Sequence, residues 1–268
     1  MSTGRRIINS LSVAITRQVC AALGECELTH QSRVRIDIAR AVEQHHEYEA
    51  ALATLGCKVI SLPPQPSLPD SVFVEDAAIV LDELAIVTRP GVQSRRPETA
   101  SIAEALAPHR RIWFVEAPGT IEGGDVLCLG RQLFVGLSGR SNESGIMQLR
   151  AIVWPHGYTV TSVQVDACLH LKSAVSQVAD RTLLVNPAWI DPSVFGACAV
   201  IDVDPDEPAA ANGLFVRDTV LYPASFPRTR GRLEAAGIAV VPVDVSELQK
   251  AEGAVTCCSL IFQGGLLA

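Results

Sequence analysis

Apolar residues follow two alternating periods along this chain, and the first clear case lies near the N-terminus. Residues 37–55 carry bulky side chains at helical spacing, at Ile38, Val42, His45, Tyr48, Leu52 and Leu55. Gly56 interrupts this pattern, and residues 58–62 then form an apolar run closed by two prolines. The pattern predicts a helix that ends at Gly56 and is followed directly by a strand.

From residue 72 onward, one order of strand, strand, helix and strand recurs four times. The predicted inner strands are residues 72–80, 123–129, 173–178 and 212–216, and the predicted helices are residues 98–106, 143–153, 192–198 and 229–236. The other predicted strands are residues 84–88, 111–115, 133–136, 158–161, 182–185, 199–202, 220–222 and 239–243. A period of about 40–50 residues is typical of propellers and other repeat architectures.

A fifth repeat is divided between the two ends of the chain. Residues 254–262 supply its first strand, and the N-terminal segment with the 37–55 helix and the 58–62 strand would complete it. Such a division closes a ring, because each end of the chain pairs with the other. We therefore predict a single domain over residues 1–268, a five-bladed pseudo-symmetric α/β propeller of strand-strand-helix-strand repeats. An ordinary open α/β sheet is the alternative.

The least apolar residues lie at or just before the predicted first strand of each repeat. In chain order they are Asp70, Glu75 and Asp76, then Glu122 and Asp125, His170 and Lys172, Asn212, and finally Thr256 and Cys257. If these strands surround the ring axis, the polar side chains of all five repeats converge there. The pattern then predicts a site for a small ligand at the axis. For any one of these residues alone, a turn or a satisfied buried polar group is the alternative.

Two adjacent cysteines, Cys257 and Cys258, lie in the last of these segments. Neighbouring side chains of an extended strand point to opposite faces, so one thiol can face a cavity while the other is buried. We predict that Cys257 faces the cavity and acts as a nucleophile. The alternative is a pair of buried structural thiols, because free cysteine is among the most buried residue types.

Composition and charge exclude several classes of protein. The chain is 48% hydrophobic and 19% charged with a net charge of −7, which indicates a well-buried globule and argues against nucleic-acid binding. Its eight cysteines are scattered, without the spacing of a zinc site, which indicates a reducing compartment. No apolar stretch approaches the ~20 residues that span a bilayer, and the N-terminus lacks a signal-peptide core. We expect a cytoplasmic protein that binds neither nucleic acid nor membrane.

Seven short motifs, in this order, carry a resemblance to one family. They are residues 68–76 (LPDSVFVED), 88–91 (TRPG), 94–96 (SRR), 121–126 (IEGGDV), 135–140 (VGLSGR), 170–173 (HLKS) and 256–259 (TCCS). Together they resemble the dimethylarginine dimethylaminohydrolases, which are guanidine-modifying enzymes with the five-bladed pentein fold. The resemblance extends from about Leu28 to Phe262, and the fold it implies agrees with the repeat pattern.

The resemblance implies hydrolysis of an Nω-methylated arginine. Asymmetric dimethylarginine or monomethylarginine would be converted to citrulline and dimethylamine or methylamine through a covalent thiouronium intermediate on cysteine. The substrate would be a small cationic amino acid, and the chemistry requires no metal and no organic cofactor. A guanidinium carbon is a poor electrophile, so the reaction needs a strong nucleophile, carboxylates that hold the cation and an acid for the leaving amine.

The same resemblance assigns three catalytic roles. Cys257 would be the nucleophile, His170 the general acid and then base, and Glu122 the carboxylate that orients His170 and favours its charged form. A substrate cation beside Cys257 would favour its thiolate, so substrate binding is expected to assist activation. The other five histidines are expected on the surface, namely His30, His45, His46, His109 and His156.

The substrate contacts implied by the resemblance come from several repeats. Glu75 and Asp76 would hold the guanidinium, Asp70 with the backbone carbonyls of Leu28 and Ala251 would hold the α-ammonium group, and Arg95 and Arg140 would hold the α-carboxylate. For each arginine, a solvated surface charge is the alternative. Residues 23–31 resemble the family's mobile lid.

One departure from related enzymes favours methylated arginine. Arginine deiminases and amidinotransferases commonly carry an acid two residues after the catalytic histidine, where this chain has Lys172. Without that carboxylate, the far guanidinium nitrogens have space for methyl groups. An arginine deiminase-like hydrolase of another guanidine and a non-catalytic pentein binding protein are the alternatives. The sequence leaves the oligomeric state open between monomer and homodimer.

Overall fold

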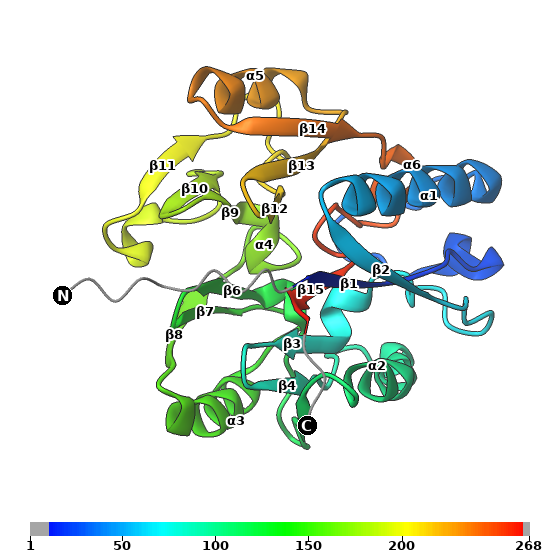
Figure 1. The fold of residues 1–268 in the computed structure, drawn as a ribbon, viewed down its shortest axis with the longest axis vertical. Coiled ribbons are helices and arrows are strands. Elements are labelled where there is room, and N and C mark those ends of the chain that lie inside the picture. The colour runs from blue at the N-terminus through cyan, green and yellow to red at the C-terminus, as the bar shows by residue number, and fades with distance from the viewer. Residues whose placement is uncertain (1–10, 265–268) are drawn as a thin grey trace.

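The short apolar runs fold into five sheets of three strands each, which are arranged in a ring (Figure 1). The computed structural model describes residues 11–264. Between successive sheets, apolar side chains pack into five separate core clusters. The predicted five-bladed α/β propeller is therefore confirmed, and each sheet forms one blade.

Each blade joins an inner, a middle and an outer strand. In chain order the first four blades are β3 (Ala78–Val80), β4 (Leu84–Val87) and β5 (Arg111–Phe114); β6 (Val126–Leu129), β7 (Gln132–Leu137) and β8 (Thr159–Gln164); β9 (Val175–Ala179), β10 (Thr182–Val185) and β11 (Ala199–Asp202); and β12 (Leu214–Val216), β13 (Thr219–Pro223) and β14 (Ala239–Val243). The fifth blade contains β15 (Leu260–Gln263), β1 (Ser12–Arg17) and β2 (Cys57–Leu62).

Helices connect the middle strand to the outer strand and lie on the rim. They are α1 (Ile38–Thr54) in the fifth blade, α2 (Thr99–Leu106) in the first, α3 (Glu143–Val153) in the second and α5 (Pro227–Ala235) in the fourth. The third blade has only the 3₁₀ turn η6 (Pro192–Phe195), so the helix predicted over residues 192–198 is wrong. Pro192 starts this turn and Gly196, with a positive φ, ends it, which leaves too few residues for a longer helix.

All five blades share one pairing pattern. The middle strand pairs antiparallel with the inner strand and parallel with the outer strand, as in the second blade, where Val126 pairs with Val135 and Gln132 with Thr159. A tight turn suffices for the antiparallel pair, whereas a parallel pair needs a crossover connection. The alternation of tight turns and longer connections in the sequence thus determines the pseudo-symmetry of the ring.

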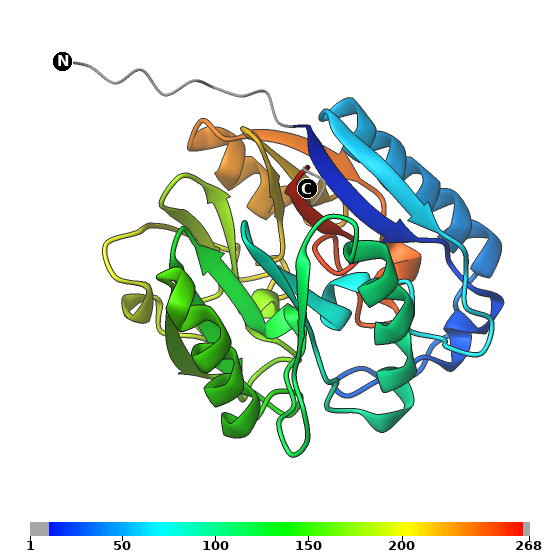
Figure 2. The same ribbon diagram turned by 60° about the horizontal axis from the view of Figure 1, so that its bottom comes forward.

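The fifth blade brings together the two ends of the described chain. β1 pairs antiparallel with β15 from Ser12–Gln263 to Ile15–Leu260, and its other edge pairs parallel with β2 (Figure 2). The N-terminal strand is thus the middle strand of a sheet whose inner strand comes from the C-terminal region. This pairing closes the ring and leaves neither end as a free inner edge.

The inner strands are shorter than the sequence pattern predicts. Residues 74–77 of the predicted strand 72–80 form the 3₁₀ helix η2 (Val74–Ala77), and residues 123–125 of the predicted strand 123–129 form η4 (Gly123–Asp125). The first two residues of the predicted strand 173–178 lie in the short helix α4 (Leu171–Ala174). Residues 255–258 likewise form turns before β15. Near the axis the backbone therefore leaves the ladder and bonds across blades, as in the Glu75 N–H bond to the Cys257 carbonyl at 3.1 Å.

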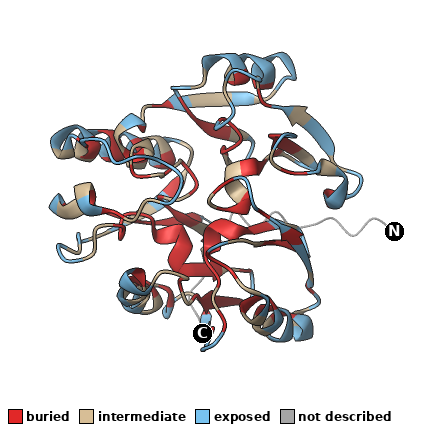
Figure 3. Ribbon diagram, turned by 180° about the vertical axis from the view of Figure 1, so that it is seen from behind, coloured by how far each residue is buried: buried red, intermediate tan, exposed pale blue. Residues whose placement is uncertain are grey.

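Burial is greatest at the centre of the ring and least on the rim (Figure 3). The prediction that His45 is a surface residue is wrong, because it lies on the buried face of α1 with only 1% of its surface exposed. Burial lowers the pKa of His45 to about 4, against an opposing charge from Glu49. His45 is therefore a neutral packing residue, whereas His30 and His46 are exposed as expected and His109 and His156 are partly exposed.

Candidate active site

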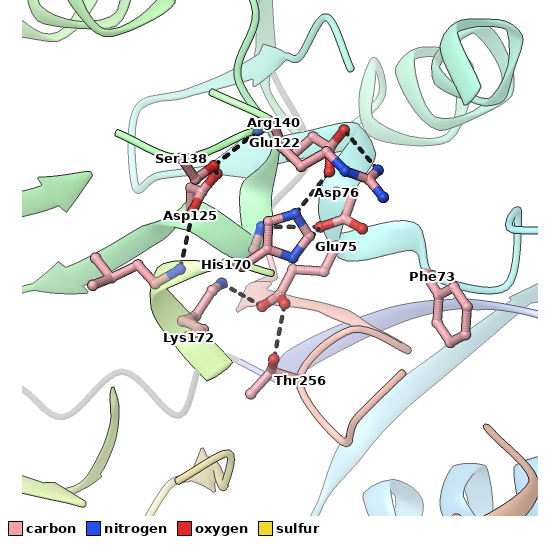
Figure 4. Close-up of polar contacts among 12 residues, drawn as sticks. Phe73, Glu75, Asp76, Glu122, Asp125, Ser138, Arg140, His170, Lys172 and Thr256 are labelled. Atoms are coloured by element: carbon pink, nitrogen blue, oxygen red, sulfur yellow. Dashed lines mark hydrogen bonds and ion pairs between the residues drawn. The ribbon is translucent and has the colours of Figure 1, made fainter. Parts of the chain in front are cut away.

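His170 and Glu122 form a buried pair at the centre of the ring (Figure 4). His170 immediately precedes α4 in the third blade, and Glu122 immediately precedes η4 in the second. His170 Nε2 lies 2.7 Å from Glu122 Oε2, and His170 Nδ1 lies 4.0 Å from Asp76 Oδ1. The imidazole therefore lies between two carboxylates that come from two different blades.

The close approach of these groups depends on Gly124. A Cβ atom at this position would lie 2.6 Å from His170 Nδ1 and 2.8 Å from Asp76 Oδ1. The Gly124 N–H also donates to Asp76 Oδ1 at 3.1 Å. Gly124, the second glycine of the motif at residues 121–126, is thus needed because any side chain there would occupy the space between the imidazole and the carboxylate of Asp76.

The surrounding charges keep His170 protonated. Burial by itself would lower the pKa of His170, but the negative charges of Asp76, Asp125 and Glu122 outweigh it and raise the pKa to about 9. Conversely, burial would raise the pKa of Glu122, and the hydrogen bond and positive charge of His170 lower it. At neutral pH the pair is an imidazolium and a carboxylate, which suits His170 as a proton donor.

Asp125 supports both His170 and Arg140. Its carboxylate is fully buried and accepts hydrogen bonds from the backbone N–H of Leu171 at 2.9 Å and from the hydroxyls of Ser138 and Ser141 at 2.7 and 2.6 Å. Leu171 directly follows His170, and the two serines flank Arg140. The sequence placed Asp125 near the axis but gave no indication of this supporting role, because its partners lie in two other segments, residues 138–141 and Leu171.

Cys257 lies in a turn, so the premise that it lies on an extended strand is wrong. The expected difference in exposure still holds, because Cys257 is partly exposed and Cys258 is fully buried. The turn gives the two thiols different exposure, and its backbone is hydrogen-bonded to neighbouring elements rather than to a strand. Tyr48 of α1, for example, donates its hydroxyl to the Val255 carbonyl at 2.8 Å.

Thr256 fixes the other side of this turn. Asn212 and Thr256 exchange two hydrogen bonds, at 3.0 and 3.1 Å, and the Thr256 hydroxyl donates to Glu75 Oε2 at 2.8 Å. Burial and the charges of Glu75 and Asp76 raise the pKa of Cys257 to about 12. The charge of Asp76 thus raises the pKa of both the Cys257 thiol and the His170 imidazole. The thiol is protonated at neutral pH.

The two carboxylates predicted to hold a guanidinium are both buried and both paired. Glu75 forms an ion pair with Lys172 in addition to its bond from Thr256 (Figure 4). Asp76 Oδ2 accepts from Arg95 Nη1 at 2.8 Å. Burial favours the neutral acid, but the charges of His170 and Arg95 outweigh it and lower the pKa of Asp76 to about 2. Both residues therefore lie where the sequence placed them, at the axis.

Arg95 and Arg140 are buried, so the surface alternative is wrong for both. Arg95 pairs with Asp76 and with Glu98, whose Oε2 lies 3.0 Å from Arg95 Nη2. Arg140 Nη2 donates to Thr29 Oγ1 at 2.9 Å, whereas Nη1 lies 3.5 Å from Glu122 Oε1 and makes no hydrogen bond within the described residues. Arg140 thus retains an unused donor for an anionic group. Nothing in the sequence indicated Glu98 as the partner of Arg95.

The residues predicted to hold the α-ammonium group lie in or near the predicted lid. Asp70 is buried and accepts from the Glu27 N–H through both oxygens, at 3.1 and 3.3 Å. Leu28 is partly buried, and Ala251 is buried in the turn that follows α6 (Ser246–Gln249). A cavity of about 520 Å³ lies beside this region, bounded by His30 and Gln31, by Leu169 and by Ala254. Asp70 thus contacts the predicted lid directly, and Glu252, the neighbour of Ala251, contacts it as well.

Within residues 11–264, one cluster has side chains that could hold a metal ion, namely Asp76, Glu122 and His170. Arg95 Nη1 lies 2.8 Å from Asp76 and 3.9 Å from Glu122, and the protonated His170 offers no lone pair on Nε2 toward Glu122. These residues do not fit a metal in this charge state. In the described part of the chain, no helix is both long and apolar enough to cross a membrane.

Comparisons with known proteins identify related sequences and structures. The family described as N,N dimethylarginine dimethylhydrolase, eukaryotic, matches residues 17–193. A Streptomyces coelicolor protein named N(G),N(G)-dimethylarginine dimethylaminohydrolase is 40% identical over 249 residues, which cover 92% of this chain and 95% of that protein.

Two solved structures are similar over nearly the whole chain. One is the Pseudomonas aeruginosa dimethylarginine dimethylaminohydrolase, a cysteine-to-serine mutant complexed with citrulline. The other is a histidine-to-glycine variant of dimethylarginine dimethylaminohydrolase as an adduct with S-methyl-L-thiocitrulline. Each has a TM-score of 0.89 and 36% identity, and each comparison covers 93% of this chain and 98% of the other.

Proposed function

This chain belongs to the dimethylarginine dimethylaminohydrolase family, and from that premise we propose that it hydrolyses Nω-methylated arginine. Asymmetric dimethylarginine and monomethylarginine are its substrates, and citrulline is formed with dimethylamine or methylamine. The observation that carries the proposal is the buried His170–Glu122 pair at 2.7 Å, with Asp76 near both the imidazole and the Cys257 thiol. Nucleophile, acid and cation-binding carboxylate are the three groups that the reaction requires.

In the proposed reaction, Cys257 forms the covalent bond. When the substrate cation binds, the thiol releases its proton to solvent, and the thiolate attacks the guanidinium carbon. The bond from that carbon to the methylated nitrogen breaks after His170 donates a proton to the leaving amine. Water, deprotonated by His170, then attacks the thiouronium carbon and releases citrulline and the cysteine. Because the pKa of the free thiol is about 12, the positive charge of the substrate is needed to stabilise the thiolate.

Binding of the substrate uses the remaining predicted residues. Asp76 and Glu75 hold the guanidinium, and Asp70 with the carbonyls of Leu28 and Ala251 holds the α-ammonium group. Arg140 and Arg95 hold the α-carboxylate, and the unused Nη1 donor of Arg140 supports this role. We also propose a single domain over residues 1–268, a cytoplasmic location suggested by the scattered cysteines, and a reaction without metal or cofactor.

The second candidate is hydrolysis of free arginine by an enzyme of the same fold. Lys172 favours methylated arginine, because its ammonium group pairs with Glu75 where an additional carboxylate would attract unmethylated nitrogens. We expect kcat/KM for asymmetric dimethylarginine to exceed that for arginine by about 100-fold. Citrulline release from each substrate by the purified full chain measures this ratio. A ratio below one would favour the deiminase-like alternative, and no citrulline from either substrate would favour a non-catalytic protein.

Replacing Glu122 by glutamine tests the role of its charge. The amide keeps the size of the side chain but removes the negative charge that stabilises the imidazolium, so the pKa of His170 falls from about 9. We expect kcat to fall by about 100-fold and the alkaline limb of the pH–rate profile to move to lower pH. Glu116→Gln, at an exposed glutamate, is the control. Unchanged turnover in Glu122→Gln would remove Glu122 from the catalytic group.

A further inference from the structure

The segment over the predicted ammonium site, residues 27–31, is held on two sides. We call these residues the lid. On one side, the Glu27 N–H donates to Asp70, and the Thr29 hydroxyl accepts from Arg140 at 2.9 Å. Asp70 and Arg140 are also the groups proposed to bind the two ends of the substrate. These contacts therefore compete with the substrate or are shared with it.

On the other side, one carboxylate holds three consecutive backbone amides. The Thr29 N–H donates to both oxygens of Glu252, at 3.1 and 3.0 Å, and the N–H groups of His30 and Gln31 donate to Oε1 at 2.6 Å each. Successive N–H groups that converge in this way form an anion-binding concavity. Glu252 lies more than 220 positions further along the chain, so the contact is purely tertiary.

The backbone at Glu252 has an unusual conformation that its turn holds in place. Glu252 has a φ of 58°, a left-handed conformation that is uncommon for a residue other than glycine. Its N–H donates to the Gln249 carbonyl at 3.1 Å, and the Gly253 N–H donates to the Leu248 carbonyl at 3.0 Å. A Cβ on Gly253 would lie 2.3 Å from the Phe73 ring, so the turn is packed directly against the first blade.

Resting on the function proposed above, we propose that Glu252 is a positioning residue that holds the lid in place while substrate occupies Asp70 and Arg140. Asp70 and Arg140 have proposed roles in substrate binding, whereas Glu252 and Ser94, whose hydroxyl donates to Glu27 Oε1 at 2.5 Å, have none, and Glu252 holds the lid backbone. Glu252 directly follows Ala251, and it binds the N–H of the Leu28–Thr29 peptide. Because a peptide unit is planar, fixing the Thr29 N–H also fixes the direction of the Leu28 carbonyl. Glu252 thus sets the relative positions of the two carbonyls proposed for the ammonium group.

Glu252→Ala tests this role through the balance of KM and kcat. The variant keeps every proposed reacting group, so kcat is expected to stay within about threefold while KM for asymmetric dimethylarginine rises about tenfold or more. Glu25→Ala is the matched control, because it removes an exposed glutamate that lies in the predicted lid segment 23–31 but outside the residues 27–31 that Glu252 and Asp70 contact. It is expected to keep the KM of the unmodified chain. A KM for Glu252→Ala equal to that of the control would overturn the proposal.

Trypsin cleavage gives a readout that does not depend on turnover. Arg33 follows the lid and is exposed, and its guanidinium bonds to the Gly24 and Cys26 carbonyls. Proteolysis requires local opening of several residues, so release of the lid should speed cleavage after Arg33 by about tenfold. Peptide mass spectrometry of Glu252→Ala, Glu25→Ala and the unmodified chain compares the rates. Equal rates in all three would overturn the proposal, even if the unmodified chain makes no citrulline and the proposed function fails.

Discussion

Replacing Cys257 by serine should reduce citrulline formation from asymmetric dimethylarginine by about 10⁴-fold or more. A serine hydroxyl is a much weaker nucleophile than a thiolate, and its alkoxide is harder to form beside the negative charges of Glu75 and Asp76. The variant should still bind substrate, because Glu75, Asp76, Asp70 and Arg140 are unchanged. Steady-state assays and equilibrium binding of asymmetric dimethylarginine measure the two properties separately.

The control for this variant is Cys128→Ser, which changes an exposed thiol on β6. It is expected to retain full turnover, and thermal unfolding of both variants shows whether they fold. Turnover by Cys257→Ser within tenfold of the unmodified chain would show that another residue is the nucleophile. Cys258 would then be the next candidate, although its complete burial argues against it.

The state of the Cys257 thiol can be measured by alkylation in the free protein. With a pKa of about 12, only a small fraction is thiolate at neutral pH, so the rate of reaction with iodoacetamide at Cys257 should rise about tenfold per pH unit from pH 7 to 10. Turnover should lack this steep rise, because the bound substrate cation lowers the thiol pKa. A plateau in the alkylation rate below pH 9 would mean that the thiolate forms without substrate.

Replacing His170 by glycine should reduce turnover of asymmetric dimethylarginine by about 10³-fold or more, because both proton transfers lose their donor and acceptor. The leaving amine is strongly basic and departs only after it is protonated, so the first step is the most affected. The imidazolium, which lies 2.7 Å from Glu122 and has a pKa of about 9, combines a proton at neutral pH with the ability to release it. Citrulline assays from pH 6 to 10 measure the loss.

A second substrate separates the two steps in His170→Gly. S-methyl-L-thiocitrulline carries methanethiol as its leaving group, which departs without a strong acid, so Cys257 should form the thiouronium and release methanethiol. Hydrolysis of that intermediate should then be slow, and the protein should gain one covalent group per chain by mass spectrometry. His156→Gly, at a partly exposed histidine, should turn over normally and gain no mass. Rapid citrulline release without an adduct in His170→Gly would contradict a role in the second step.

The strand and helix order of this chain was predictable, because it depends on local periodicity. The helix over residues 37–55 matches α1, and the short apolar runs match the middle and outer strands of the blades. The inner strands were overestimated, because an apolar segment such as residues 254–262 suggests a strand throughout. Near the axis, contacts with other blades turn the backbone out of the ladder, as Tyr48 and Glu75 do for the Cys257 turn.

The candidate site was predictable to a different extent at each residue. His170, Glu122 and Asp76 carry functional groups suited to the chemistry, and their places before the inner strands indicated the axis. Asp125 was also placed at the axis, but its supporting role was not indicated. Glu98 and Glu252 gave no such signal, because a carboxylate in a turn is ordinary in sequence. Their roles depend on partners in distant segments of the chain, such as the lid amides that Glu252 binds.

By itself, the sequence determined the repeat, the kinds of reactive groups and the blades that carry them, since these follow from the order of side chains along the backbone. Only the tertiary structure decided which groups touch and which are charged. Carboxylates of other blades raise the pKa of His170 to about 9 against the effect of burial, whereas burial and such carboxylates together raise the pKa of Cys257 to about 12. Electrostatic energies depend on distance and burial in three dimensions, and residues 48 positions apart, such as His170 and Glu122, acquire these only when the ring closes.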